Sequence, residues 1–181
     1  MKLDMSEEEL KNYTKNELKI CASNFSYFCE KYVSVKRYFD GRNLEVPFVL
    51  EKFQRKVVKQ LNNNTKNICV KFRRGGFSTM MAIYALWEIL FKDNYKVLIL
   101  SSRDRTAVDI LKIASFALSR LPNWMVNPEE IKINNSHQIK IKNSFIISME
   151  PMASCGVSYD HMMVDEPFSQ IYLNLLMSLS N

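Results

Sequence analysis

Hydrophobic and polar positions repeat with two different periods along this chain, and the period predicts where helices and strands lie. Apolar residues spaced three and four apart predict three helices in the first third of the chain, at residues 6–20, 24–33 and 48–61. Ser6-Glu-Glu-Glu9 has the form of a capping box, which marks the start of the first helix. Between the second and third helices, residues 37–46 contain Asp40-Gly41 and predict a turn or an irregular connection.

The remainder of the chain alternates strands with helices. Continuous apolar runs predict buried strands at residues 67–71 and 96–101, and helical spacing follows each of them, at residues 80–90 and from Asp104 or Thr106 to about Arg120. Period-two alternation predicts half-exposed antiparallel strands at residues 131–134 and 139–142, ahead of further strands at 145–149 and 161–166. This order predicts an α/β sheet with right-handed crossovers.

The stretch Lys71-Phe-Arg-Arg-Gly-Gly-Phe-Ser-Thr79 joins an expected strand to an expected helix. A strand, a glycine-bearing turn and a helix in that order are the setting of a phosphate-binding loop. The helix N-terminus presents backbone N–H groups and a positive dipole end, and glycine lets the backbone approach a phosphate closely. Phe77 stands directly after the last glycine, where such loops usually carry a lysine, and three cations precede the glycines instead: Lys71, Arg73 and Arg74. The charge of the site has therefore moved upstream, or the site is inactive.

Two adjacent carboxylates close the apolar run His161-Met-Met-Val-Asp-Glu166. A buried parallel strand needs no alternation, and its carboxyl end lies where open α/β sheets bind their ligands. There Asp165 would hold Mg²⁺ directly or through water, and Glu166 would orient and deprotonate an attacking water. Because Pro167 can start a helix, a second interpretation stays open in which the two carboxylates cap that helix. The loop and the acidic pair together, in this order, predict a nucleotide hydrolase.

Composition and charge narrow the class of protein only in part. The 181 residues, 47% of them hydrophobic, suffice for one folded domain with a core. The net charge of +6 and the pI of about 9.1 are compatible with nucleic acid as a partner, and equally with lysines spread over solvated surfaces. No apolar run approaches the roughly 18 residues that cross a bilayer, and the polar start does not resemble a secretory signal. The four cysteines lie far apart, which argues against zinc or disulfides and favours a reduced cytoplasm.

The set of motifs and their order resemble the N-terminal ATPase domain of the terminase large subunit, the DNA-packaging motor of tailed phages. Leu50-Glu-Lys-Phe-Gln-Arg55 is similar to the adenine-side glutamine motif, and Lys71–Thr79 is similar to a variant phosphate loop that begins with a lysine or arginine. Leu98–Arg103 and Leu121-Pro122 are similar to segments that follow in the family, and Met162–Glu166 matches its acidic strand motif. The likeness covers roughly residues 24 to 175.

The resemblance implies a role for each residue of the site. Lys71 would reach the β- and γ-phosphates, and Arg73 would stabilise the charge that develops on the transferred phosphoryl group. Ser78 and Asp165 would hold Mg²⁺, and Glu166 would be the catalytic carboxylate. The expected ATP-binding residues are Phe53, Gln54, Lys71, Arg74, Gly75, Gly76, Phe77, Ser78 and Thr79.

For three of these residues a structural interpretation stays open. Phe53 has the spacing of a core position as well as the place of an adenine platform. Gln54, which would hydrogen-bond the adenine edge, also fits a solvated helix position. Arg74 fits a solvated or DNA-facing charge as well as a phosphate contact.

The resemblance also implies a P-loop NTPase fold of the RecA-like ASCE class, a mainly parallel sheet flanked by helices. A helical N-terminal extension is expected at residues 1–46 and a partial ATPase domain at 47–181. Family members continue into a coupling motif and a nuclease domain, whereas this chain has 15 residues after Glu166. We therefore expect an incomplete sheet, no nuclease domain, and a truncated or split large subunit.

The partners implied in this way are double-stranded DNA, portal protein, the small terminase subunit, a separate C-terminal terminase polypeptide and further copies in a ring, with no membrane. The implied place of action is the cytoplasm of an infected bacterial host, at the procapsid portal. Two alternatives remain: a fragment of a helicase-type ATPase, and a degenerate module that binds nucleotide or assembles without hydrolysis.

Overall fold

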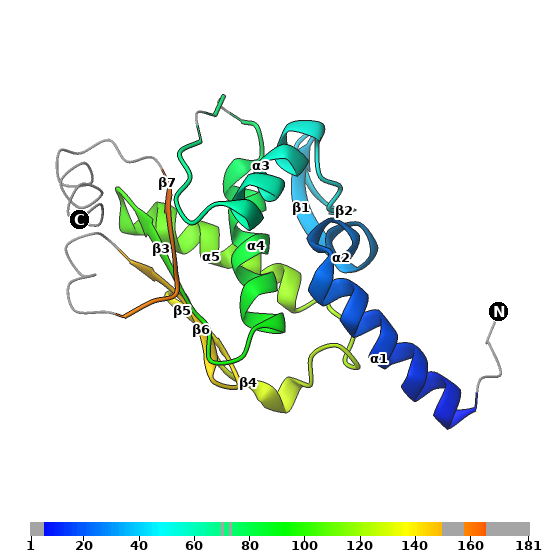
Figure 1. Cartoon of the computed structure of the whole chain (residues 1–181). Helices are drawn as coiled ribbons and strands as arrows, with labels where there is room; N and C mark the ends of the chain where they lie inside the picture. The colour runs from blue at the N-terminus through cyan, green and yellow to red at the C-terminus, as the bar shows by residue number, and fades with distance from the viewer. Residues whose placement is uncertain (1–5, 70, 73, 150–157, 166–181) are drawn as a thin grey trace. The chain divides into compact units, whose positions relative to one another are not determined.

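A computed structural model describes residues 6–69, 71–72, 74–149 and 158–165 (Figure 1). Contacts within the chain divide it into two compact units. The first unit comprises Met1–Phe72 with Arg120–Pro128, and the second comprises Arg73–Ser119 with Glu129–Asn181. The expected division at residue 47 stays a prediction.

Two helices begin the first unit, α1 at Glu7–Ser23 and α2 at Phe25–Tyr32, as predicted. The capping box is confirmed: the Ser6 backbone N–H donates to Glu9 Oε2 at 2.8 Å, and the Glu9 N–H donates to Ser6 Oγ at 3.3 Å. Asn24 caps α2 in the same manner by accepting the Tyr27 N–H at 3.0 Å. Local side-chain chemistry therefore sets both helix starts.

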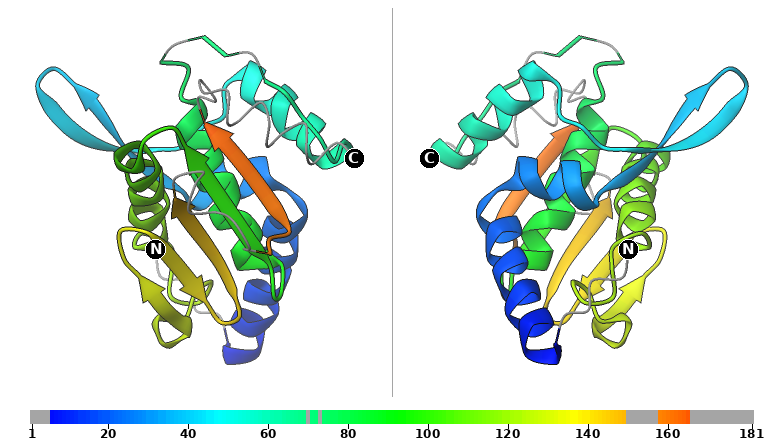
Figure 2. Two further views of the ribbon diagram at one scale, coloured as in Figure 1. Left: turned by 90° about the vertical axis from the view of Figure 1, so that its left-hand side faces the viewer. Right: turned by 90° about the vertical axis from the view of Figure 1, so that its right-hand side faces the viewer.

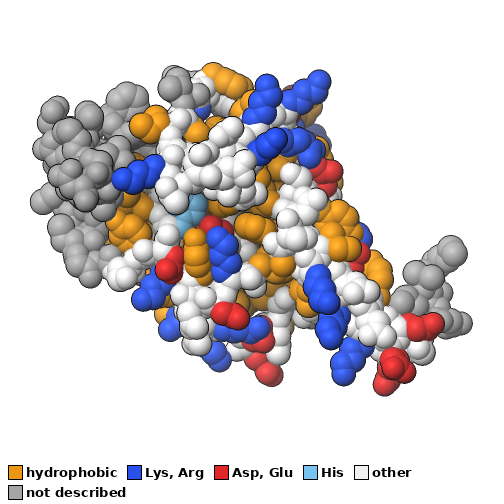
Figure 3. All heavy atoms as spheres, viewed as in Figure 1, with side chains coloured by type: hydrophobic (Ala, Val, Ile, Leu, Met, Phe, Trp, Pro, Cys, Tyr) orange, Lys and Arg blue, Asp and Glu red, His pale blue; other side chains and the backbone are white. Residues whose placement is uncertain are grey.

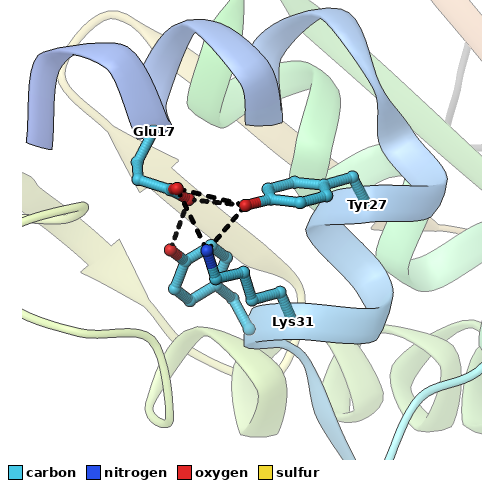
Figure 4. A network of polar contacts seen from close by, with 4 residues as sticks. Glu17, Tyr27 and Lys31 are labelled. Carbon is cyan, nitrogen blue, oxygen red and sulfur yellow. Dashed lines mark hydrogen bonds and ion pairs between the residues drawn. The ribbon is translucent and has the colours of Figure 1, made fainter. Parts of the chain in front are cut away.

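A polar network holds α1 against α2. Glu17 of α1 is 6% exposed, and its carboxylate accepts hydrogen bonds from the hydroxyls of Tyr27 and Tyr32. Lys31 Nζ lies 3.0 Å from the same carboxylate. In Figure 4 the carboxylate of Glu17 points toward the Tyr27 phenol and the Lys31 ammonium. A buried carboxylate is stable only when it is paired and hydrogen-bonded, as this one is.

The irregular connection predicted at residues 37–46 is wrong. Strands β1 (Ser34–Phe39) and β2 (Arg42–Pro47) form an antiparallel hairpin there. The predicted turn at Asp40-Gly41 is confirmed, with φ angles of 48° and 75°, and two positive φ angles match the twist of a two-residue hairpin. Nearly all of the hairpin is exposed on both faces, so burial imposed no period-two alternation on its sequence.

Helix α3 (Lys52–Asn63) begins four residues later than predicted. Its N-cap is Glu51, in extended conformation, so residues 48–51 precede the helix rather than form its first turn. The buried residues within α3 are Gln54 and Val58, which lie one turn apart. The inward stripe therefore centres on them, while Phe53 and Val57 are only partly buried.

The second unit is built on a five-stranded sheet in the order β4-β5-β6-β3-β7. The strands, all at or near their predicted positions, are β3 (Lys96–Ser101), β4 (Ile131–Asn134), β5 (Gln138–Ile141), β6 (Ser144–Met149) and β7 (His161–Asp165). Strand β3 pairs in parallel with both β6 and β7, whereas β5 pairs antiparallel with β4 and β6. The α/β class is confirmed, but the sheet is mixed rather than mainly parallel, because the β4–β5 hairpin extends one edge. Figure 2 shows β7, in orange, beside β3.

Helices α4 (Phe77–Phe91) and α5 (Asp104–Leu118) pack against each other and against β3 and β6, so they cover one face of the sheet. The N-cap of α5 is Arg103, not Asp104 or Thr106. The opposite face carries Leu98 and Leu100, packed among apolar side chains of β6 and β7. A short 3₁₀ helix, η1 (Pro128–Glu130), precedes β4.

The strand predicted at residues 67–71 is not formed in the described part of that segment. Residues 67–69 and 71–72 have no strand pairing, Cys69 is exposed, and the Ile68 side chain is 92% exposed. An apolar run becomes a strand only when a neighbouring strand satisfies its backbone groups, and sequence composition does not supply that neighbour.

Candidate functional site

The glycine turn ahead of α4 contains two residues in the left-handed region of backbone conformation. Gly76 is the N-cap of α4 with φ 68° and ψ 20°, and Arg74 also has a positive φ of 65°. The first helical hydrogen bond runs from the Met80 N–H to the Gly76 carbonyl at 3.0 Å. As in any α-helix, the N–H groups of the first turn have no partner within the helix and point out of its N-terminus. The predicted residues Phe77, Ser78 and Thr79 form that first turn.

Ser78 and Asp165 meet across the second unit. The Ser78 hydroxyl donates to Asp165 Oδ2 at 2.6 Å. Asp165 is 3% exposed and ends β7, at the edge of the sheet where the carboxyl end of β3 also lies. The structure therefore places the predicted loop serine and the predicted strand carboxylate together.

A second polar contact joins the other ends of the same two elements. Near the end of α4, Glu88 Oε2 lies 2.6 Å from Nδ1 of His161, the first residue of β7. From Ser78 to Glu88 the helix rises about 15 Å, and from His161 to Asp165 the strand rises about 13 Å. The first turn of α4 therefore contacts the end of β7 and its last turns contact the start of β7, so the helix and the strand run in opposite directions.

The Ser78–Asp165 pair presents oxygen atoms of the kind that a divalent cation such as Mg²⁺ takes as ligands. The Ser78 hydroxyl and the Asp165 carboxylate supply hard oxygen donors, which Mg²⁺ prefers. No cluster of three or more His, Cys, Asp or Glu side chains with metal-binding geometry occurs among the described residues. Mg²⁺ at nucleotide sites usually takes one or two protein ligands and completes its shell with phosphate oxygens and water.

The predicted adenine-side residues and Lys71 belong to the first unit. Gln54 is buried, and its Oε1 accepts the Glu51 backbone N–H at 2.9 Å, so it completes a capping box at the start of α3. The Phe53 ring meets the Phe72 ring edge-on at a centroid distance of 5.1 Å. These contacts account for both residues structurally, and their contact with adenine stays a prediction. Lys71 is partly buried.

Two predicted catalytic residues, Arg73 and Glu166, lie outside the described residues, and their roles stay predictions. Arg74 and Gly75 lie in the turn itself, Arg74 exposed and Gly75 partly buried. Sequence reasoning missed Glu88 as a contact residue. The available signal was a single carboxylate inside a helix that is otherwise apolar on almost every side.

Comparison with models of known protein families finds none that matches this chain. Among the described residues, no helix combines the length and the apolar character that a membrane span requires.

On the face shown in Figure 3, Lys and Arg side chains are distributed over several elements and mixed with acidic and apolar side chains. This distribution does not point to one particular element as a polyanion site.

Proposed function

We propose that this chain is an ATP-binding and hydrolysing module of the P-loop type, belonging to a DNA-packaging motor of the terminase large-subunit kind. One observation carries the proposal: Ser78 Oγ donates to Asp165 Oδ2 at 2.6 Å, although 87 positions separate the two residues. In P-loop NTPases a serine or threonine of the loop and an aspartate at a strand end hold Mg²⁺ together.

The topology of the second unit supports the same proposal. The parallel strands β6, β3 and β7 end at one edge of the sheet, and ligands of open α/β sheets bind outside such carboxyl ends. Helix α4 begins at this edge, because its first turn contacts the end of β7. Gly76 adopts the left-handed conformation at little cost because it has no side chain. The missing side chain also lets the backbone approach a phosphate closely.

In the proposed mechanism each residue has a limited task. The first-turn N–H groups of α4 and the positive end of its dipole bind phosphate oxygens. Lys71 and Arg73 supply positive charge, Arg73 as a planar donor that is always protonated. Glu166 orients the attacking water and accepts its proton, while Ser78 and Asp165 present oxygens to the cation. If Mg²⁺ is held there by Ser78 and Asp165, it would supply positive charge that offsets the negative charge developing on the phosphate.

The finer parts of the proposal rest on the resemblance. They are double-stranded DNA, portal protein, a small terminase subunit and a separate C-terminal polypeptide as partners, a ring of copies, and action at the procapsid portal in the host cytoplasm. The net charge of +6 is compatible with a DNA partner without selecting one.

The test is Mg²⁺-dependent ATP hydrolysis by the purified chain, with and without duplex DNA. Lys71→Ala, Asp165→Asn and Glu166→Gln should each lower turnover by about 100-fold or more, as losses of essential catalytic or cation-holding groups do. Asp160→Asn is the matched control, because Asp160 lies just before β7, at the opposite end of that strand, and accepts the Lys96 N–H at 2.9 Å. An amide keeps this acceptor, so the control should keep full activity.

The possible outcomes separate the alternatives. Hydrolysis that survives all three substitutions would contradict the proposed site. ATP binding without turnover in the parent chain would favour the degenerate module, particularly if a complementing C-terminal polypeptide does not restore activity. Stimulation by single-stranded rather than duplex DNA would favour the helicase-type ATPase.

A further inference from the structure

Two serine hydroxyls are buried in the second unit without a hydrogen-bond partner. Among the described residues, Ser101 Oγ and Ser148 Oγ are the buried side-chain nitrogen or oxygen atoms in this state. The two residues are 0% and 1% exposed. Buried hydroxyls nearly always find a partner, because an unsatisfied one destabilises the fold. A buried hydroxyl that has no partner in the ligand-free state of a protein can gain one when a ligand binds.

Both hydroxyls lie on the face of the sheet that carries α4. Side chains alternate between faces along a strand, and Leu98 and Leu100 of β3 point to the opposite face, where they pack against apolar residues of β6 and β7. Ser101 therefore shares a face with Asp165, its register partner on β7, which contacts Ser78 of α4.

The two serines differ in what stands beside them. Ser101 ends β3 directly beside Asp165, and neighbouring strands lie about 4.8 Å apart. Ser148 lies one row back from the strand ends, in register with Ile99 on β3. Only Ser101 has a carboxylate as its register partner.

We propose that Ser101 is a positioning residue for Asp165, and that its hydroxyl donates to the Asp165 carboxylate when a Mg²⁺–nucleotide occupies the site. This inference rests on the proposed function. A carboxylate can accept several hydrogen bonds on its two oxygens, and Asp165 accepts one from Ser78 at Oδ2. Carboxylates that bind a cation are themselves held by hydrogen bonds from neighbouring groups. Ser101 is the donor that the sheet register places beside this one.

Removal of the Ser101 hydroxyl should have opposite effects on the chain without ligand and on the chain with Mg²⁺–nucleotide bound. Without ligand, Ser101→Ala removes an unsatisfied buried group, so the chain should become no less stable. With ligand, the same change removes a hydrogen bond to the cation-binding carboxylate, so cation affinity should fall. A residue with a purely structural role would show no such opposition.

The experiment measures two quantities on the full chain and its variants. Mn²⁺ binding is titrated by electron paramagnetic resonance at a saturating concentration of a non-hydrolysable ATP analogue, and Tm is measured without ligand. Ser101→Ala should weaken Mn²⁺ binding about tenfold while Tm stays the same or rises by about 2–4 °C. Ser148→Ala, the matched control, should show the same behaviour of Tm with unchanged Mn²⁺ affinity. Ser101→Thr keeps the donor and should keep the affinity.

Three results would overturn the inference alone: parental Mn²⁺ affinity in Ser101→Ala, an equal loss of affinity in Ser148→Ala, or a lower Tm accompanying the loss in Ser101→Ala. Failure of the parent chain to bind Mn²⁺ with the nucleotide analogue would instead overturn the proposed function, and this inference with it.

Discussion

Glu17 offers the most direct test of what holds the first unit together. The substitution Glu17→Gln keeps the shape of the side chain and removes its charge. The carboxylate accepts from Tyr32 Oη at 2.6 Å, from Tyr27 Oη at 3.0 Å and from Lys31 Nζ at 3.0 Å. An amide offers one acceptor oxygen, and its NH₂ group faces donors.

The expected loss follows from these three contacts. A hydrogen bond to a charged group contributes about 1.5–3 kcal/mol to stability. Lys31 is exposed and Tyr27 is partly exposed. Water therefore replaces much of the hydrogen bonding that these two side chains lose in Glu17→Gln. The Tyr32 bond is the shortest of the three and dominates the sum, so we expect a loss of about 2–3 kcal/mol. For a chain of this size that corresponds to a Tm lower by about 5–10 °C.

The pH dependence has a definite sign. The hydrogen bond from Tyr32, followed by those from Lys31 and Tyr27, holds the pKa of the Glu17 carboxyl below its ordinary value of 4.5. Because the folded chain binds this proton more weakly than the unfolded chain does, the stabilisation is complete above about pH 4.5 and is lost as the pH falls through the folded pKa. The difference between parent and variant should therefore be largest at neutral pH and shrink under acid.

Urea unfolding followed by circular dichroism at pH 7 and at pH 4 measures both effects. Glu8→Gln is the control, since Glu8 is an exposed carboxylate in the first turn of the same helix. It should cost no more than about 1 kcal/mol, the scale of a dipole interaction at a surface. Equal stability of parent and Glu17→Gln at pH 7, or a difference that grows under acid, would refute the reasoning.

Two further predictions concern the turns and the thiols. Alanine at Gly41 or at Gly76 forces a side chain into the left-handed region and should cost roughly 1–2 kcal/mol in either place, but only the change at Gly76 should also weaken ATP binding. Nothing lies within 4 Å of a Cβ added at Gly41, so this variant measures the strain alone; equal ATP affinity in both variants would contradict a phosphate role for the loop. Among the described cysteines, exposed Cys69 should react first with a thiol reagent, while burial raises the pKa of Cys21 to about 11 and that of Cys29 well above its ordinary value. Mass spectrometry of labelled peptides checks this order, and early labelling of Cys21 or Cys29 would contradict it.

The elements that the sequence predicted well are those whose causes are local. Ser6 and Glu9 form their capping box within one turn of chain, and Asp40-Gly41 adopts its turn from the conformational freedom of those two residues. The apolar run of β3 and the period-two pattern of β4 likewise contain their own signal. The ends of helices were less certain, because α3 begins only after an extended segment that its periodicity does not reveal.

In the candidate site, too, the local features could be predicted from the sequence and the long-range contacts could not. The glycine turn ahead of α4 and the carboxylate that ends β7 were both predicted from residue order, since each pattern occupies a few consecutive positions; that the turn binds phosphate stays a prediction. The contact between the two motifs could not be predicted, because the 2.6 Å hydrogen bond between Ser78 and Asp165 depends on how α4 packs against the sheet. The contact of Glu88 with His161 depends on the same packing.

By itself, then, the sequence determined the approximate positions of the helices, the capping box of α1 and the α/β alternation, because short-range sterics and hydrogen bonding decide these. Only the tertiary structure decided the mixed strand order, the absence of strand pairing in the described part of residues 67–72, and the place of Ser101 beside Asp165. The physical reason is that strand pairing and buried polar contacts join residues far apart in the chain. The free energy of such a contact depends on which distant residue or strand is its partner. No local sequence pattern identifies that partner.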